Sequence, residues 1–136
     1  MMVPINYWAV LVAAVFTMAL GFLWYGPVFG KKWAHLAGLN MENMKMNPWN
    51  MLIIAVGTLI MAFVLDHALI FASTYMQVSG VAAGLEVGFA NWIGFIAPVT
   101  VGVVLWEGKS WKLWLINAGY YLVALCGMGI ILALWM

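Results

Sequence analysis

The sequence predicts an all-α membrane protein in which four transmembrane helices form an antiparallel bundle, with a short cytoplasmic interfacial helix between the first two. Hydrophobic residues make up 68% of the chain and charged residues 7%, whereas a soluble domain is about one quarter charged. A soluble protein of 136 residues could not bury that much apolar surface. A helix needs roughly 20 apolar residues to cross a bilayer, and the chain has room for four. We therefore expect one domain, residues 1–136, with the lipid bilayer as its main partner.

The first predicted span covers residues 5–25. Aromatic side chains such as Trp8 and Trp24 mark its two ends, as membrane interfaces favour. Pro27 follows and ends the helix, because proline has no N–H and a fixed φ. A signal peptide would carry basic residues before its apolar run, whereas here they follow it, so we expect this span to be retained.

The segment between the first two spans, residues 28–47, is the most polar part of the chain. Within it, Trp33, Leu36 and Ala37 would form one apolar stripe on a helix. Such a stripe beside charged residues is typical of a helix that lies in the membrane interface. We therefore expect a short interfacial helix here, although Gly38 and Asn40 do not favour a helix.

The other three spans are predicted over residues 48–71, 81–105 and 111–135. Asn47 is a suitable N-cap, and Pro48 a suitable first residue, for the second span. Pro98 should kink the third span. The connection between the second and third spans is short, so these two should be antiparallel neighbours.

The lysines indicate how the chain is oriented in the membrane. All five lie in or beside the first and third connections: Lys31, Lys32, Lys45, Lys109 and Lys112. Basic residues accumulate on the cytoplasmic side of a membrane protein, so these connections should be cytoplasmic. The sequence therefore predicts a multi-pass protein of the inner (cytoplasmic) membrane with both termini outside.

Glycines recur along one face of the third span. Gly80, Gly84 and Gly88 are four residues apart, so they form a nearly straight ridge on a helix. Small residues at this spacing let two helices approach closely in lipid. The ridge could pack against the fourth span of the same chain, which offers Gly119, Gly127 and Gly129, or it could form a subunit interface.

Three ionisable side chains are predicted to share one layer in the outer half of the bundle. Asp66 and His67 lie on the second span and Glu86 on the third. A charge at the bilayer centre costs about 2.5–3.5 kcal/mol, so intramembrane carboxylates are candidates for function. We expect His67 to pair with one carboxylate, or one carboxyl to be protonated, giving a proton or cation site open to the outside. The alternative is that each carboxylate only satisfies nearby donors.

Glu86 lies roughly opposite the glycine ridge. The third span would then have one face for packing and another for the polar cluster. This arrangement is consistent with a central position of the third span in the bundle.

A second set of polar side chains is expected in the cytoplasmic half of the fourth span and near the middle of the third. Hydrogen bonds between helices there contribute only about 0.6 kcal/mol each on average. We expect an interhelical network with a structural role, formed by Asn91, Asn117, Tyr120 and Tyr121.

Several kinds of chemistry find no support in the sequence. A net charge of +1 does not favour a nucleic-acid partner. His35 and His67 should lie on opposite sides of the membrane, which argues against haem, and the ligands for a zinc site are too few. Met41, Met44 and Met46 are thioethers that would suit Cu(I), but packing is the simpler explanation. Without a catalytic motif, we expect no enzyme, metal or cofactor.

Four stretches in order along the chain resemble a bacterial family of small integral membrane proteins known as domain of unknown function 1761. They are residues 6–8 (NYW), 21–33 (GFLWYGPVFGKKW), 91–95 (NWIGF) and 106–122 (WEGKSWKLWLINAGYYL). The resemblance implies four membrane helices and brings no established activity or ligand. It draws attention to Trp92, Asn117 and Tyr120, and to a motif on the cytoplasmic side: Trp24, Tyr25, Pro27, Trp33 and Glu107. Glu107 could pair with the lysines of that side.

Two functions remain open from the sequence. The first is non-enzymatic transport or sensing of a small solute or ion by a homo-oligomer, because four short helices enclose little volume and a path would form more easily between subunits. The second is a scaffold or accessory subunit of a membrane complex, whose glycine ridge docks a partner. A water-filled cavity that reaches Glu86 or Asn117 would favour the first.

Overall fold

The computed structural model describes residues 2–45 and 47–136, and every regular element in these ranges is a helix. Four helices are long and apolar enough to cross a membrane: Tyr7–Val28, Pro48–Met76, Gly80–Leu105 and Trp111–Leu134. The predicted all-α fold with four spans is confirmed. The second span differs most from its expected bounds, because the helix continues beyond Phe71 to Met76.

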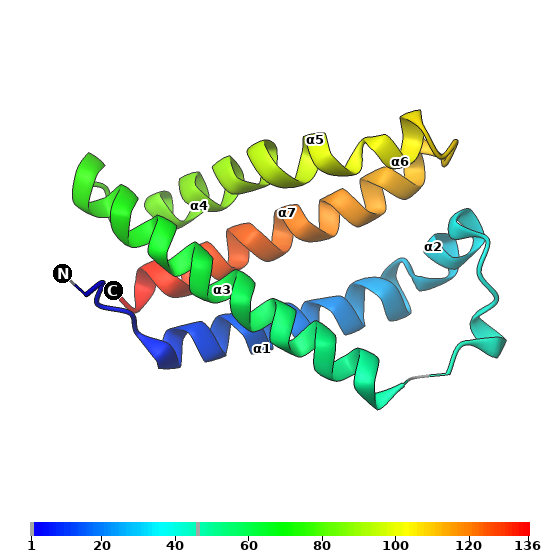
Figure 1. The fold of residues 1–136 in the computed structure, drawn as a ribbon, viewed down its shortest axis with the longest axis horizontal. Coiled ribbons are helices and arrows are strands. Elements are labelled where there is room, and N and C mark those ends of the chain that lie inside the picture. Colours follow the sequence, from blue (N-terminus) through cyan, green and yellow to red (C-terminus); the bar gives the residue numbers. More distant parts are fainter. Residues whose placement is uncertain (1, 46) are drawn as a thin grey trace.

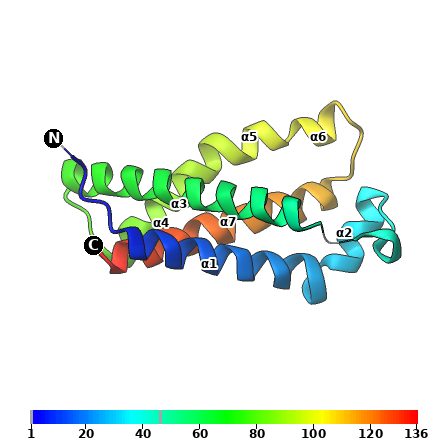
Figure 2. The ribbon, with the colours of Figure 1, turned by 60° about the horizontal axis from the view of Figure 1, so that its bottom comes forward.

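The four spans run in alternating directions, so both ends of the chain lie at the same end of the bundle (Figure 1). Helix α1 (Tyr7–Leu23) and α3 (Pro48–Met76) cross one another, and α4 (Gly80–Asn91) lies along α7 (Trp111–Leu134). Helix α7 packs against α1, α3 and α4, which makes it the central helix. Figure 2 shows α7 between α1 and the third span. The prediction that the third span is central is therefore wrong.

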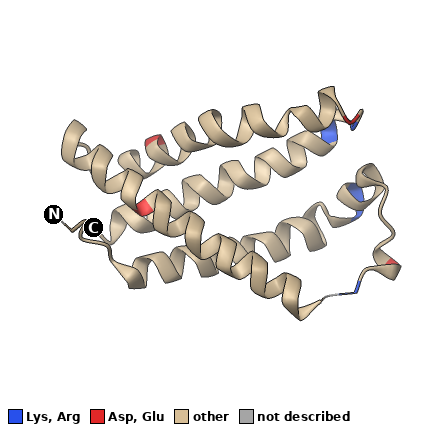
Figure 3. Ribbon diagram, in the orientation of Figure 1, with Lys and Arg blue, Asp and Glu red and all other residues tan. Residues whose placement is uncertain are grey.

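The charged residues divide between the two ends of the bundle. Lysines lie only at the end remote from the termini, whereas two acidic residues lie within the helices toward the other end (Figure 3). We call these the lysine-bearing end and the terminus-bearing end. The lysines of the first and third connections thus lie together at one end of the bundle, as the predicted orientation of the chain requires.

Helix α1 leads into a turn with π-type hydrogen bonds, Trp24–Val28, in which the helical backbone breaks at Gly26, directly before Pro27, as the sequence predicts. The N–H of Phe29 donates to the carbonyl of Trp24 at 2.9 Å, while Gly26 leaves the helical region with φ −112° and ψ −105°. The turn leads into α2 (Gly30–Ala37), the short helix expected between the first two spans. Gly30 is required there, because a Cβ would lie 2.6 Å from the carbonyl oxygen of Tyr25.

The third span is interrupted near Pro98. After α4, a π-helical turn (Trp92–Ile96) precedes the short helices α5 (Ala97–Thr100) and α6 (Gly102–Leu105). Proline lacks the N–H that would continue the hydrogen-bond ladder, and π-turns are a common site of helix kinks. The predicted distortion is present, and it begins before the proline.

The tightly packed core lies toward the terminus-bearing end. It consists of buried residues from all four spans, and many of them are small: Ala9, Val10, Ala13, Ala62, Leu65, Leu69, Ala83, Val87, Leu125, Met128, Leu132 and Ala133. At the lysine-bearing end, α5 and α6 diverge from α1 and α2 (Figures 1 and 2). The helices therefore pack most closely toward the terminus-bearing end and spread apart toward the other.

Helices α4 and α7 approach so closely that their backbones touch. A Cβ on Gly88 would lie 2.6 Å from the carbonyl oxygen of Leu125, and one on Gly84 would fall on the backbone of Gly129. Gly80 begins α4 with φ 73° and faces open space, so it is not part of this contact. The glycine face thus packs within the chain, against α7.

Candidate functional site

A pocket of about 320 Å³ opens at the terminus-bearing end between the start of α1, the C-terminal part of α3 and the end of α7. It is lined on its polar side by Asn6, Asp66, Ser73 and Thr74, and on its other side by residues that include Leu132 and Trp135. Asp66 lies about 15 Å from the end of α3 at Met76, given a rise of 1.5 Å per residue. The pocket therefore joins a carboxylate within the span to the end of the bundle.

Asp66 is the most unusual side chain of the pocket. Its exposed fraction is 2%, because the face of α3 that carries it also carries the buried Leu65 and Leu69. Among the described residues, nothing forms a hydrogen bond with its Oδ2 atom. A buried carboxylate oxygen without a hydrogen-bond partner is costly in a low-dielectric interior. The site therefore favours either a proton on this carboxyl or a cation beside it.

The two hydroxyl groups that line the pocket present acceptors rather than donors. The hydroxyls of Ser73 and Thr74 both donate to the carbonyl of Ile70, at 3.0 and 2.8 Å. Since each hydroxyl has one hydrogen, only oxygen lone pairs remain for a ligand. The pocket therefore combines a carboxylate with hydroxyl oxygens, a set that suits a cation or a protonated amine.

Asn6 links the two ends of the chain at the edge of the pocket. Its side-chain oxygen accepts from the N–H groups of Trp8 and Ala9, at 3.1 and 3.2 Å, which caps α1. Its amide nitrogen donates to the carbonyl of Trp135 at 3.3 Å. The same residue thus begins the first span and ties it to the end of the last one.

The predicted cluster of three ionisable residues is not formed. His67 turns away from Asp66: its Nδ1 lies 2.9 Å from the carbonyl oxygen of Phe63 on its own helix, and its ring lies 4.5 Å from that of Phe63 between centroids. Successive helical residues point about 100° apart, so Asp66 and His67 face different neighbours. Glu86 is exposed on α4, since the opposite face of that helix carries Gly84 and Gly88 against α7. Neither His67 nor Glu86 lines the pocket, so only Asp66 of the three remains in the site.

The predicted polar network is also arranged differently. The amide of Asn91 donates to the carbonyl of Val87 on its own helix at 2.8 Å. Asn117 instead accepts from the hydroxyl of Tyr25 at 2.8 Å. The hydroxyl of Tyr120 donates to the carbonyl of Thr17 at 3.1 Å. The bonds of Asn117 and Tyr120 therefore join α7 to the first span, and not to the third.

Aromatic rings surround that junction. The ring of Tyr120 lies 5.3 Å from that of Tyr25 and 5.0 Å from that of Tyr121. Trp33 of α2 packs edge-on against Tyr25 at 5.1 Å. Most of the motif that the family resemblance singled out therefore meets in one place, with Pro27 in the turn that positions it.

Two tryptophans hold the central helix from opposite sides, which the sequence did not predict. The indole N–H of Trp24 donates to the carbonyl of Ile116 at 2.9 Å, and that of Trp92 donates to the carbonyl of Ala118 at 2.7 Å. The first and third spans thus bind carbonyl groups within one turn of α7. The family resemblance had marked both tryptophans, but no spacing along the chain links them to their acceptors.

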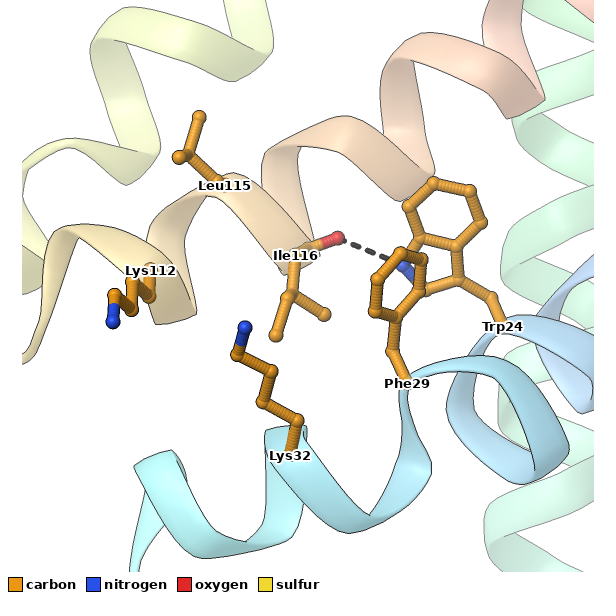
Figure 4. Close-up of a pocket in the computed structure, with 6 residues that line it drawn as sticks. All are labelled: Trp24, Phe29, Lys32, Lys112, Leu115 and Ile116. Atoms are coloured by element: carbon orange, nitrogen blue, oxygen red, sulfur yellow. Dashed lines mark hydrogen bonds between the residues drawn. The ribbon is translucent and has the colours of Figure 1, made fainter.

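A second pocket, of about 200 Å³, lies beside Trp24 at the lysine-bearing end. It is bounded by α2, by the turn before it and by the start of α7 (Figure 4). Its lining consists of Trp24, Phe29, Lys32, Lys112, Leu115 and Ile116. Glu107 is exposed and lines neither pocket. The expected pairing of Glu107 with the lysines has no counterpart among the contacts of the described residues.

Within residues 2–45 and 47–136, no group of three or more His, Cys, Asp and Glu side chains could hold a metal ion. Met41 and Met44 are 42% and 48% exposed. Met46, the third methionine of the considered copper cluster, lies outside the described residues.

A family model described as "Protein of unknown function (DUF1761)" matches residues 8–133, nearly the whole chain. No curated protein and no solved structure matches the chain.

Proposed function

This chain belongs to the DUF1761 family of proteins of unknown function, and we propose that it binds a proton or small cation at Asp66, for transport or sensing. It is an integral membrane protein by the length and apolarity of its four candidate spans. The lysine distribution favours the cytoplasmic membrane with both termini outside. The pocket would then open to the outside, and the role would be non-enzymatic.

The observation that carries this proposal is the orphan oxygen of Asp66. Its carboxylate is buried and its Oδ2 lacks a hydrogen-bond partner within the described part of the chain. Ser73 and Thr74 offer only acceptor oxygens toward a ligand, because Ile70 accepts both of their protons. At Asp66, a cation of the size of Na⁺ or a primary ammonium would satisfy the unpaired oxygen, and the hydroxyl oxygens of Ser73 and Thr74, two turns further along α3, would favour its passage through the pocket. An anion would meet no donor among them.

We expect Asp66→Asn to abolish cation binding, because the substitution keeps the shape of the side chain and removes its charge. The full-length protein in detergent is titrated with NaCl or ethylammonium chloride, at ionic strength held constant with the bulky cation N-methylglucamine. A ligand at 100 times its Kd stabilises a protein by about 2.7 kcal/mol. The wild type should unfold at a higher temperature as the small cation increases, and Asp66→Asn should show no such shift.

Glu86→Gln is the matched control, because it removes the other intramembrane carboxylate from an exposed position. It should respond to the cations as the wild type does. In weakly buffered solution, a cation that displaces a proton from Asp66 also releases that proton, which a pH indicator measures. If Asp66→Asn and the wild type shift equally, Asp66 does not bind the cation and the proposal fails.

The third span supports a homo-oligomer as the working unit. Only 11% of its most apolar window is buried within the chain, the smallest share of the four spans. Glu86 lies on this open surface, about 9 Å from the start of α4 at Gly80. A carboxylate facing lipid is costly, so a second copy of the chain would cover this face better than lipid does.

Cysteine cross-linking tests this arrangement in native membranes. Ala82 lies one turn before Glu86 and is exposed, so Ala82→Cys in a Cys126→Ala background should form a disulfide-linked dimer under mild oxidation. Val56→Cys on the exposed surface of α3 is the control and should cross-link far less. Equal cross-linking at both positions, or none at Ala82, would speak against the oligomer.

The scaffold alternative loses its main support. The glycine face that was expected to dock a partner is occupied by α7, through Gly84 against Gly129 and Gly88 against Leu125. A partner that required this face would have to displace the central helix.

A further inference from the structure

We propose that the pocket between α2 and α7 binds the phosphate group of an anionic phospholipid. Lys32 extends from α2 across the gap toward α7, and Lys112 lies beside it in the first turn of α7 (Figure 4). The pocket stands at the lysine-bearing end, separate from Asp66 at the terminus-bearing end. It is therefore a second site with the opposite charge preference.

The two lysines lack an acidic partner. No contact between a carboxylate and either ammonium group occurs within 4 Å in the described residues, and Glu42 and Glu107 line neither pocket. Two like charges beside one cavity attract an anion and focus its approach. A phosphate offers several acceptor oxygens, which can accept charge-assisted hydrogen bonds from both ammonium groups. The pair of lysines thus fits a phosphate better than it fits any group of this chain.

The rest of the lining is apolar. The rings of Trp24 and Phe29 lie 4.8 Å apart between centroids, and the indole N–H of Trp24 is already bonded to the carbonyl of Ile116. Leu115 is 61% exposed, so in a membrane the α7 wall of the pocket faces lipid. An acyl chain can lie along Leu115 while the phosphate sits between the lysines. A free phosphate would leave this apolar wall unused.

The size of the pocket also favours a headgroup. Its volume of about 200 Å³ is below the 300–1,000 Å³ of typical small-molecule sites. A phosphate with its ester oxygens needs no more room than this. Basic pockets between membrane helices are known sites for anionic headgroups. We therefore assign the pocket to a lipid phosphate rather than to a nucleotide or another large phosphorylated solute.

Lipid binding by the full-length protein in detergent tests the proposal. The protein is titrated with phosphatidylglycerol, with phosphatidylcholine of the same chain length, and with inorganic phosphate, and bound molecules are counted by native mass spectrometry. Each lysine near an anionic lipid headgroup raises the affinity of the protein for that lipid about fivefold. The double variant Lys32→Gln/Lys112→Gln should bind phosphatidylglycerol roughly 30-fold more weakly, while phosphatidylcholine binding should hardly change.

Lys31→Gln/Lys109→Gln is the matched control, since it removes the same charge from two exposed lysines outside the pocket. It should keep phosphatidylglycerol affinity within about twofold of the wild type, less than the effect of one lysine in the pocket. Equal losses in both double variants would show a diffuse charge effect and overturn the site. A loss confined to inorganic phosphate, with lipid binding unchanged, would overturn the lipid as its occupant.

Discussion

Replacing Gly84 with alanine is expected to destabilise the protein by about 3 kcal/mol, the upper end of the usual cost of overpacking. The added methyl group would fall on the backbone of Gly129, which cannot move without moving α7. In lipid, close van der Waals packing supplies much of the energy that holds helices together. Forcing α4 and α7 apart would therefore weaken the most extensive helix contact of the fold. Reversible unfolding in mixed detergent micelles measures the change.

Gly57→Ala is the control for this experiment. Gly57 lies within α3, and nothing is found within 4 Å of the position that its Cβ would take. Alanine is favoured over glycine in a helix by up to about 1 kcal/mol, so this variant should be neutral or slightly more stable. If the two alanine variants had the same stability, the close contact between α4 and α7 would be refuted.

Replacing Trp24 with alanine is expected to cost about 3–5 kcal/mol, as for other large aromatic residues within a packed interface. The indole contacts Phe29 and Tyr120, at 4.8 and 6.3 Å between ring centroids, and it bonds the carbonyl of Ile116. Its loss would remove the contacts between the first span and α7 outside the tightly packed core. Thermal unfolding of the purified protein gives the difference.

Trp24→Phe separates the two contributions of the indole. Phenylalanine keeps most of the ring and loses the hydrogen bond, so it should cost about 0.6 kcal/mol and no more than about 1.7. Trp106→Ala is the control, because that side chain is 87% exposed and surface changes usually stay within about 0.5 kcal/mol. If Trp106→Ala lost as much stability as Trp24→Ala, the interaction of the tryptophan with detergent, and not its contact with α7, would account for the result.

Asp66 and Glu86 show where prediction from the sequence succeeds and where it stops. Both were identified as intramembrane carboxylates, because the surrounding runs are apolar and long enough to cross a bilayer. Their depth follows from counting residues along each helix. Their surroundings do not: Asp66 is buried beside a pocket, whereas Glu86 is exposed. Which face of a helix is covered depends on the neighbouring helices.

Asn117 and Tyr120 make the same point for hydrogen bonds. The sequence placed them in the membrane and expected partners on the third span. The structure pairs them with Tyr25 and Thr17 of the first span. The third span meets α7 through Gly84 and Gly88, and through bonds from the indole of Trp92 to Ala118 and from the indole of Trp114 to the hydroxyl of Thr100.

The sequence by itself determined the four spans, the short helix after the first one and the gathering of lysines at one end. Each of these depends on local properties: the length and apolarity of a run, and the charge of the segments between runs. The tertiary structure alone decided that α7 is central, that Asp66 faces a pocket without His67 or Glu86, and that Trp24 and Trp92 bind α7. The physical reason is that the bilayer requires a long apolar segment for each span, which can be recognised in the sequence. The rotation of each helix about its axis depends instead on which of its side chains pack closely against the neighbouring helices.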